Sequence, residues 1–228
     1  MVRKVFFMKA KHQISDTYWL CLLLMFTGGF IDCYTYLNRG QVFSYAQTAN
    51  LLMAALNIAQ GNWQNLSRYC IPIFAFGCGL MVAEWVRCTY REHPSIHWRQ
   101  RIVLANGLLL LLVGFLPGDR WDVLATTATS FISAMQMQSF RKFHGNTYVS
   151  TMCTGNFRTA TEHLFYSIRD HQPQRRKKAA QYYGILGCFV LGAIGSYFAS
   201  QALGEQSVFL SSALFFLIFL LMLIQEEK

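Results

Sequence analysis

Long stretches of the chain carry almost no charged side chains, and this pattern predicts helices that cross a membrane. A single acid, Asp32, interrupts the first stretch, and a single acid, Glu84, interrupts the second. A helix needs about 20 apolar residues, or about 17 at the lower end, to cross roughly 30 Å of hydrocarbon. Six stretches approach that length: 17–37, 69–86, 102–117, 123–140, 182–200 and 207–224. We therefore predict an all-α polytopic membrane protein with about six transmembrane helices.

Composition agrees with this pattern and excludes other classes of protein. The 228 residues are 54% hydrophobic and only 14% charged, with a formal charge of +9. A soluble domain carries roughly 25% charged residues, so this chain lacks the side chains needed to cover a wet surface. Disordered chains, collagen-like repeats and disulfide scaffolds are excluded as well. The first stretch is longer than the apolar core of a signal peptide, so we expect a retained span.

The basic residues indicate which side of the membrane each loop occupies, because Lys and Arg near membrane ends stay on the cytoplasmic side. With six spans and both termini cytoplasmic, 17 of the 20 basic residues share one side, and only Arg39, Arg68 and Arg120 lie on the other. An eight-span alternative, with 44–60 and 147–168 also crossing, would move the four arginines between 87 and 101 outside. We therefore prefer six spans.

The same distribution accounts for the positive net charge. Orientation in the bilayer and contact of the basic cytoplasmic loops with anionic lipid headgroups explain the surplus. The run RRKK at 175–178 would permit a nucleic-acid partner, but none is needed, so we expect no nucleic acid.

Two segments 106 residues apart resemble each other and predict an internal repeat. FSYAQTANLLMAALNIA (43–59) aligns with VSTMCTGNFRTATEHLF (149–165), so that TAN aligns with TGN. Each segment predicts an extra, polar-interrupted helix beside three spans, and an odd number of spans inverts the second copy. We expect a basic cytoplasmic arm 1–16, a first three-span repeat 17–117, a second three-span repeat 118–224 and a cytoplasmic tail 225–228. The alternative is that TAN and TGN only allow close packing of helices.

Four motifs carry a resemblance to a known family. They are GGFIDCYTYL (28–37), VFSYAQTANLL (42–52), AMQMQSFRK (134–142) and MCTGN (152–156). In this order they resemble the YoaK family of bacterial inner-membrane proteins, catalogued as the domain of unknown function DUF1275. The chain departs from the family pattern at Ala49 and Ala134, where Gly is expected, and at Met137, where Asn is expected. The resemblance implies six helical spans and a bacterial plasma membrane, but no settled activity.

Polar side chains inside apolar helices are the candidates for function. An ionised carboxylate such as Asp32 costs several kcal/mol inside a membrane unless it is paired or hydrated. The alternative for Asp32 is a hydrated position near the outer interface. Gln136 and Gln138 lie two residues apart on different helix faces, and we favour Gln136 because it matches the family motif, although it could simply bond another helix. Glu84 is expected to pair with Arg87 one turn away.

The segment after TGN has two interpretations. Arg158 and Glu162 are four residues apart and could pair on a solvated helix face at the cytoplasmic interface. If this helix is re-entrant instead, Arg158 could coordinate an anion, and Glu162 or His163 could carry a proton.

Catalytic and metal-binding patterns are not found in the sequence. The seven cysteines form no CxxC pair and fall mostly within spans, so we interpret them as small apolar residues. His93 and His97 have a metal-ligand spacing but lie in an Arg-rich loop without further ligands. GxSxG, P-loop, GxGxxG and HExxH motifs do not occur. We expect no enzyme, no metal and no cofactor.

The leading hypothesis is a small transporter or channel with a site where the two repeats meet. Asp32 would carry a coupling proton or ion, and Thr and Asn side chains would bind a small polar or anionic solute. Because six spans form a thin wall around a pathway, we expect a homodimer. The alternative is a non-transporting scaffold or membrane-embedded sensor whose polar motifs are structural. The expected substrate-binding residues are Asp32, Gln47, Thr48, Asn50, Gln136, Thr154, Asn156 and Arg158.

Overall fold

Helices make up most of the chain in a computed structural model, which describes residues 17–91, 97–143, 146–148 and 153–224. Two two-residue strands, β1 (Lys142–Phe143) and β2 (Asn146–Thr147), pair antiparallel. The predicted arm 1–16, the tail 225–228 and His93 lie outside the described residues. The helices are α1 (Tyr18–Asn38), α2 (Gln47–Ala59), α3 (Trp63–Tyr90), α4 (Trp98–Val113), η2 (Asp119–Trp121), α5 (Asp122–Ser139), α6 (Cys153–Arg169), α7 (Pro173–Leu203), η3 (Gly204–Ser207) and α8 (Val208–Ile224).

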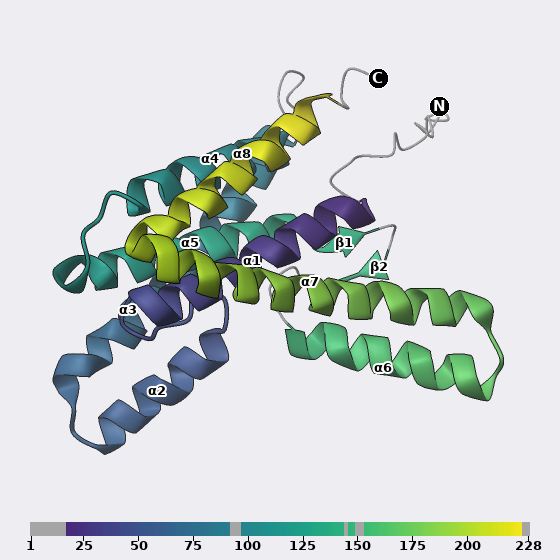
Figure 1. Cartoon of the computed structure of the whole chain (residues 1–228), viewed down its shortest axis with the longest axis horizontal. Coiled ribbons are helices and arrows are strands. Elements are labelled where there is room, and N and C mark those ends of the chain that lie inside the picture. Colours follow the sequence, from purple (N-terminus) through teal and green to yellow (C-terminus); the bar gives the residue numbers. More distant parts are fainter. Residues whose placement is uncertain (1–16, 92–96, 144–145, 149–152, 225–228) are drawn as a thin grey trace, which may run out of the picture.

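By length and composition, three helical segments are able to cross a membrane: Tyr18–Asn38, Trp63–Tyr90 and Pro173–Leu223. The third contains α7, η3 and α8. Gly204, with φ of +56°, ends α7, and Figure 1 shows α7 and α8 as the two arms of a hairpin. Such helices identify the chain as a helical membrane protein.

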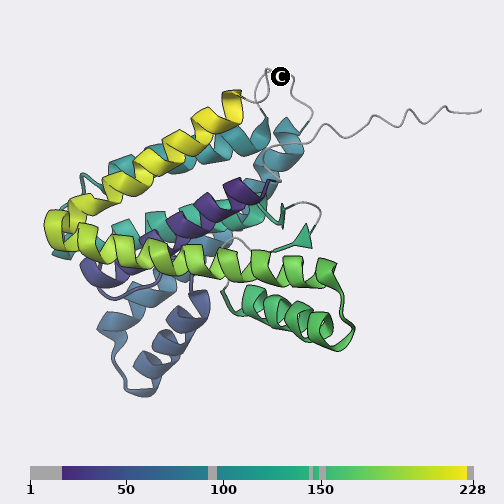
Figure 2. The ribbon, with the colours of Figure 1, turned by 45° about the vertical axis from the view of Figure 1, so that its right-hand side comes forward.

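The two halves of the chain contain the same series of helices. Each half has a first helix (α1, α5), a short helix (α2, α6), a long helix (α3, α7) and a last helix (α4, α8), and α6 starts 106 residues after α2. The first helix of each half packs along the long helix of the other half: α1 packs along α7, and α5 packs along α3. The short helices α2 and α6 pack on α3 and α7. Two similar helical hairpins result, and they diverge: the α2–α3 tip lies at the lower left of Figure 1 and the α6–α7 tip at its right, and the tips are also apart in Figure 2.

Glycines allow the exchanged helices to approach closely. A Cβ at Gly29 of α1 would collide with the carbonyl oxygen of Phe189 in α7, and a Cβ at Gly192 would collide with that of Phe26. In the other pair, a Cβ at Gly79 would lie 2.5 Å from the carbonyl oxygen of Phe131. Close backbone contact through small residues is the usual basis of helix association in lipid.

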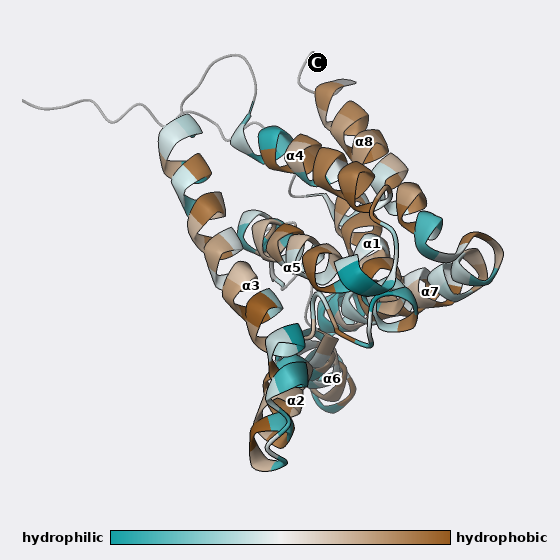
Figure 3. Cartoon of the chain, turned by 90° about the vertical axis from the view of Figure 1, so that its left-hand side faces the viewer, coloured by the Kyte–Doolittle hydropathy of each residue, from teal (hydrophilic) through white to brown (hydrophobic). Residues whose placement is uncertain are grey.

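The outer surface of the helices is apolar. Figure 3 shows hydrophobic ribbon over most of α3, α4 and α8, with hydrophilic residues near their ends. Large side chains on these and neighbouring helices face outward, such as Phe74 (74% exposed), Leu112 (63%) and Phe198 (66%). Contiguous exposed apolar surface of this kind is suited to lipid rather than to water.

Candidate functional site

Asp32 ties α1 to the segment that leads into α2. Its side chain is buried in α1, and its Oδ1 accepts a hydrogen bond of 2.7 Å from the backbone N–H of Tyr45. The backbone N–H groups of Ser44 and Ala46 also face this carboxylate. The carboxyl group therefore lies at the N-terminal end of α2, where unpaired N–H groups and the helix dipole favour its ionised form. Asp32, which the sequence singled out, is stabilised there by main-chain donors.

Side chains in and beside the TAN motif bind the backbone of the same segment, which leads into α2. The Asn50 Oδ1 accepts from the Phe43 N–H at 3.1 Å, and its Nδ2 donates to the Phe43 carbonyl and to the Gln47 Oε1. The Gln47 Nε2 donates to the Ser44 carbonyl at 2.8 Å. Backbone that leaves helix geometry in a membrane needs such polar partners. Asn50 and Gln47 therefore fold the turn before α2.

Helix α5 completes the network with a row of small polar residues. The Ser44 hydroxyl donates to Thr129 Oγ1 at 2.6 Å, and Ser133 donates to the Ser44 carbonyl at 2.7 Å. The Tyr45 hydroxyl donates to the Gln136 Oε1 at 2.8 Å, and the Gln136 Nε2 donates to the Leu24 carbonyl. The structure thus brings Gln136 into one buried cluster with Asp32.

Gln138 lies elsewhere, at the end of α5. Its Nε2 donates to the Glu84 carboxylate at 2.7 Å. Glu84 also pairs with Arg87, which confirms the predicted one-turn ion pair, and lies 3.7 Å from Arg141. Gln138 is the position that aligns with Asp32 in the repeat, so the second half has no carboxylate at the equivalent place.

The second motif, TGN, begins α6 close to the same centre. The Cys153 thiol is within electrostatic reach of the Asp32 carboxylate. Asn156 is buried and takes part in an interaction, as Asn50 does. The position that aligns with Phe43, the partner of Asn50, is 149, which lies outside the described residues. Thr48 and Thr154 are exposed on the first turns of α2 and α6. The first turns of both short helices therefore approach Asp32, but the two threonines are not part of the buried network.

Arg158 lies outside the cluster, on the exposed face of α6. In the described part of the chain, no ion pair joins it to Glu162. Gly155 has open space around its Cβ position, so this motif does not need glycine for packing.

Arg39 is a polar centre that we did not predict. Its side chain is fully buried after the end of α1, and its guanidinium donates to the Tyr34 hydroxyl at 2.8 Å and to the Leu116 and Pro117 carbonyls. It also pairs with Asp122 at 3.3 Å and lies 3.7 Å from Glu205. In the sequence, Arg39 was one of the three basic residues that the six-span prediction separated from the other 17.

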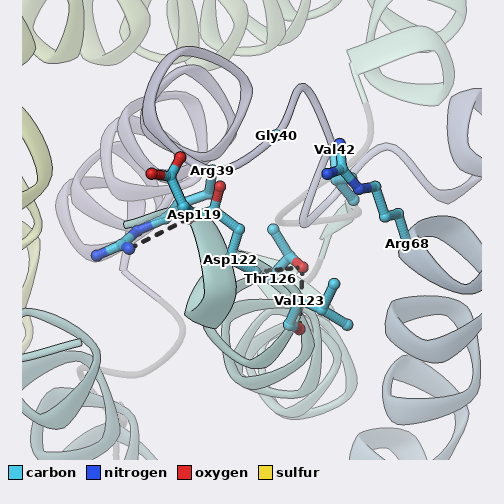
Figure 4. Close-up of a pocket in the computed structure, with 8 residues that line it drawn as sticks. All are labelled: Arg39, Gly40, Val42, Arg68, Asp119, Asp122, Val123 and Thr126. Atoms are coloured by element: carbon cyan, nitrogen blue, oxygen red, sulfur yellow. Dashed lines mark hydrogen bonds and ion pairs between the residues drawn. The ribbon is translucent and has the colours of Figure 1, made fainter. Parts of the chain in front are cut away.

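A small pocket opens beside Arg39 (Figure 4). Arg68 reaches toward Gly40 from α3, and Asp119 and Asp122 lie on the other side (Figure 4). Two of the three basic residues assigned to the outer side thus line one pocket, and the third, Arg120, belongs to the adjoining η2. The structure gathers all three at one end of the molecule.

His97, whose spacing from His93 could have suggested a metal ligand, caps a helix instead. The His97 Nδ1 accepts from the Arg99 N–H at 3.3 Å and caps α4, with Gln100 returning a bond to the His97 N–H. The described cysteines are free. Among the described residues, no group of three His, Cys, Asp or Glu side chains could hold a metal ion.

Comparison with known proteins gives one match. A family model described as "Protein of unknown function (DUF1275)" matches residues 20–221. No curated protein and no solved structure matches the chain. The match covers all eight helices in whole or in large part, including Asp32 and both polar motifs. The chain therefore belongs to the DUF1275 family.

Proposed function

We propose that this chain is a small-solute transporter or channel of the bacterial plasma membrane. Helices α1, α3, α4, α5, α7 and α8 cross the membrane as two inverted three-span repeats, and both termini are cytoplasmic. The gathering of Arg39, Arg68 and Arg120 at one end supports this orientation, because the remaining basic residues then share the cytoplasmic side. The start of α1 and the end of α8 also lie on the same side in Figure 1.

The short helices are half-helices in this proposal. Helix α2 has 13 residues, or about 20 Å, which is too short to cross the hydrocarbon. After α1 ends at Asn38, the chain returns to the level of Asp32, six residues back along that helix, before α2 starts. Non-helical backbone at this depth is tolerated only inside protein or beside a water-filled cavity. Paired half-helices of two repeats are the arrangement in which transporters place their sites.

The observation that carries the proposal is the Asp32 carboxylate, buried among neutral groups at the N-terminal end of α2. Intramembrane acids of this kind mark ion or proton pathways by default. We assign Asp32 the coupling proton or ion. The exposed hydroxyls of Thr48 and Thr154, with Asn156, would contact the solute, and Arg158 would attract an anionic one on the cytoplasmic side. Gln47, Asn50 and Gln136 would hold the site in shape.

A specific observation favours the second candidate, a non-transporting scaffold or sensor. The side chains of Asn50, Ser44, Tyr45 and Gln136 all have partners inside the chain. A fully satisfied network of this kind also stabilises a structure that binds no solute.

Uptake into proteoliposomes separates the two candidates. A panel of radiolabelled small anions and polar solutes is tested with Asp32→Asn and Asn156→Ala, and Asp170→Asn serves as the control because this acid lies exposed far from the centre. Transport predicts flux that both central substitutions abolish and the control preserves. The absence of flux for every solute, with normally folded protein, would establish the scaffold.

The remaining expectations belong to the same proposal. We propose that the chain has no enzymatic activity and no nucleic-acid partner, and that it works as a homodimer because six spans give a thin wall around a pathway. The mass of the protein in lipid nanodiscs, measured by native mass spectrometry, tests the dimer. A single copy per disc at all loading ratios would contradict it.

A further inference from the structure

The two helical hairpins, α2–α3 and α6–α7, have similar architecture but different tips. Residues 59–68, at the tip of α2–α3, include one charged side chain, Arg68. Residues 169–178, at the tip of α6–α7, include one acid, Asp170, and five basic residues: Arg169, Arg175, Arg176, Lys177 and Lys178. The tips lie at different ends of the molecule, the α2–α3 tip at the lower left of Figure 1 and the α6–α7 tip at its right. The two hairpins therefore differ in the charge of their tips and not in their architecture, as expected if the tips lie on different sides of the membrane.

The length of α7 sets the level of the basic tip. Its 31 residues extend about 46 Å, which exceeds the roughly 30 Å of hydrocarbon. With Leu203 at one edge of the hydrocarbon, the residues 175–178 lie about 37–42 Å away along the helix. A bilayer with its headgroups measures about 40–45 Å. The headgroup layer of the opposite leaflet therefore ends about 35–38 Å from that edge, and the backbone of residues 175–178 lies at its outer boundary, from which long Arg and Lys side chains can reach the headgroups.

Aromatic and apolar side chains at the tip support this level. The Tyr166 ring lies between two guanidinium groups, Arg169 at 4.6 Å and Arg175 at 4.8 Å from its centre. Phe165 is 58% exposed and Ile168 is 67% exposed on the same end of α6. Tyr rings, exposed apolar residues and basic residues together are typical of a segment at the boundary between headgroups and hydrocarbon.

Two of the basic side chains are clearly accessible. The Arg169 guanidinium pairs with the Asp170 carboxylate through two hydrogen bonds, of 2.6 Å and 3.1 Å. The Arg175 Nε donates to the Gln172 Oε1 at 2.8 Å. Arg176 and Lys177 are exposed. Side chains of this kind are free to meet phospholipid phosphates, because guanidinium binds phosphate oxygens through paired hydrogen bonds and ammonium binds them as a point charge.

We propose that the tip of the α6–α7 hairpin is a binding site for anionic phospholipid headgroups of the cytoplasmic leaflet. The sequence predicted lipid contact for the basic loops in general, and the structure narrows it to one hairpin tip with defined side chains. This proposal rests on the proposed membrane orientation but not on solute transport, since a scaffold would use the same anchor.

The test measures binding of fluorescently labelled phosphatidylglycerol to the purified full chain in neutral detergent, by anisotropy. The variant R176Q/K177Q removes two exposed charges, and the control R68Q/R120Q removes two exposed charges at the opposite end. We expect about 30-fold weaker binding for R176Q/K177Q, because each basic residue near an anionic surface contributes about 1 kcal/mol, or about fivefold in affinity. The control should bind within about twofold of the unchanged protein.

Three results would overturn the proposal. Equal binding of labelled phosphatidylcholine would show that charge plays no part. Full affinity in R176Q/K177Q would place the site elsewhere. Competition by free glycerol phosphate at concentrations similar to those of the lipid would identify a soluble phosphate ligand instead. The charge-conserving exchange R176K/K177R, which should keep the affinity, and the melting temperature of each variant show that lost binding is not lost folding.

Discussion

The Asp32 carboxylate and the backbone N–H of Tyr45 meet at 2.7 Å, although thirteen residues separate them in the chain. This hydrogen bond holds the segment between α1 and α2 against α1, after that helix has ended. The TAN motif and the polar row of α5 then hold it there. Removal of individual members of this arrangement should have distinct effects.

Replacement of Asn50 by Ala should destabilise the protein by about 1–3 kcal/mol, because the buried N–H and C=O groups of Phe43 lose their partner. The melting temperature of the purified protein in detergent measures this loss. Thr48→Ala is the control, since Thr48 is exposed in the same motif. Equal stability of the two variants would show that Asn50 does not hold the turn.

Gly29→Ala should separate α1 from α7, because its Cβ would collide with the Phe189 carbonyl oxygen. Overpacking of this kind costs about 1–3 kcal/mol or more. Gly155→Ala has open space and should be neutral or stabilising by up to about 1 kcal/mol. Thermal unfolding compares the pair. If Gly155→Ala keeps full stability but loses solute flux, the open space beside TGN is used by the solute.

Arg39→Gln should cost about 3–5 kcal/mol, because Asp122 loses its buried partner and the Leu116 and Pro117 carbonyls lose their donor. Arg120→Gln removes the same charge from an exposed position nearby and should change stability by less than about 0.5 kcal/mol. Expression level and melting temperature report both. A mild effect of Arg39→Gln would mean that the ends of α1 and α4 are held by other contacts.

Stability should fall in mild acid because of His163. Burial of the ring, and then the positive charges of Lys178 and Arg175, lower the pKa of His163, against a smaller opposite effect of Glu162. The unfolded chain then takes up a proton at a higher pH than the folded chain. The stabilisation is complete above the ordinary pKa of about 6.5 and is lost as the pH falls below it.

The comparison variant for this pH effect is His163→Phe, which keeps a ring to stack on Tyr182. The drop in melting temperature between pH 7.5 and pH 5.5 should be smaller in this variant than in the unchanged protein. Equal drops would assign the acid sensitivity to other groups.

Cysteine labelling in a background without the native cysteines should report the topology. Asn65→Cys, at the tip of α2–α3, should react with an impermeant reagent from outside the cell, whereas Gln174→Cys should react only after the membrane is opened. Arg91→Cys, after α3, discriminates the span number. Labelling of Arg91→Cys from outside would favour eight spans.

The membrane-crossing helices could be predicted from the sequence, because the apolar stretches nearly coincide with the observed helices. The predicted stretches 17–37 and 123–140 differ from α1 (Tyr18–Asn38) and α5 (Asp122–Ser139) by one residue at each end. The long helices were predicted too short: α7 (Pro173–Leu203) begins nine residues before the predicted 182. Its first turns are basic, and a search for apolar residues stops at the membrane boundary although the helix continues.

The centre of the candidate site was predicted only in part. Asp32 and Gln136 stand out as polar residues inside apolar helices, but the partners of Asp32 are main-chain N–H groups, which no sequence motif displays. Thr48 and Thr154 share the pattern of the buried Asn residues, yet helix geometry turns them outward. The buried cluster around Arg39 was not predicted, because its partners Pro117, Asp122 and Glu205 are distant from it in the sequence.

The exchange of first helices between the two halves has a consequence for biosynthesis. Helix α1 is complete at Asn38, but its main partner, α7, begins only at Pro173. At about 5–20 residues per second, α1 waits roughly 7–30 s for that partner while its glycine surface is open in the membrane. Other nascent helices compete for this surface in the interval. A ribosome that stalls in the second half of the message therefore leaves behind a fragment able to pair with the wrong neighbour.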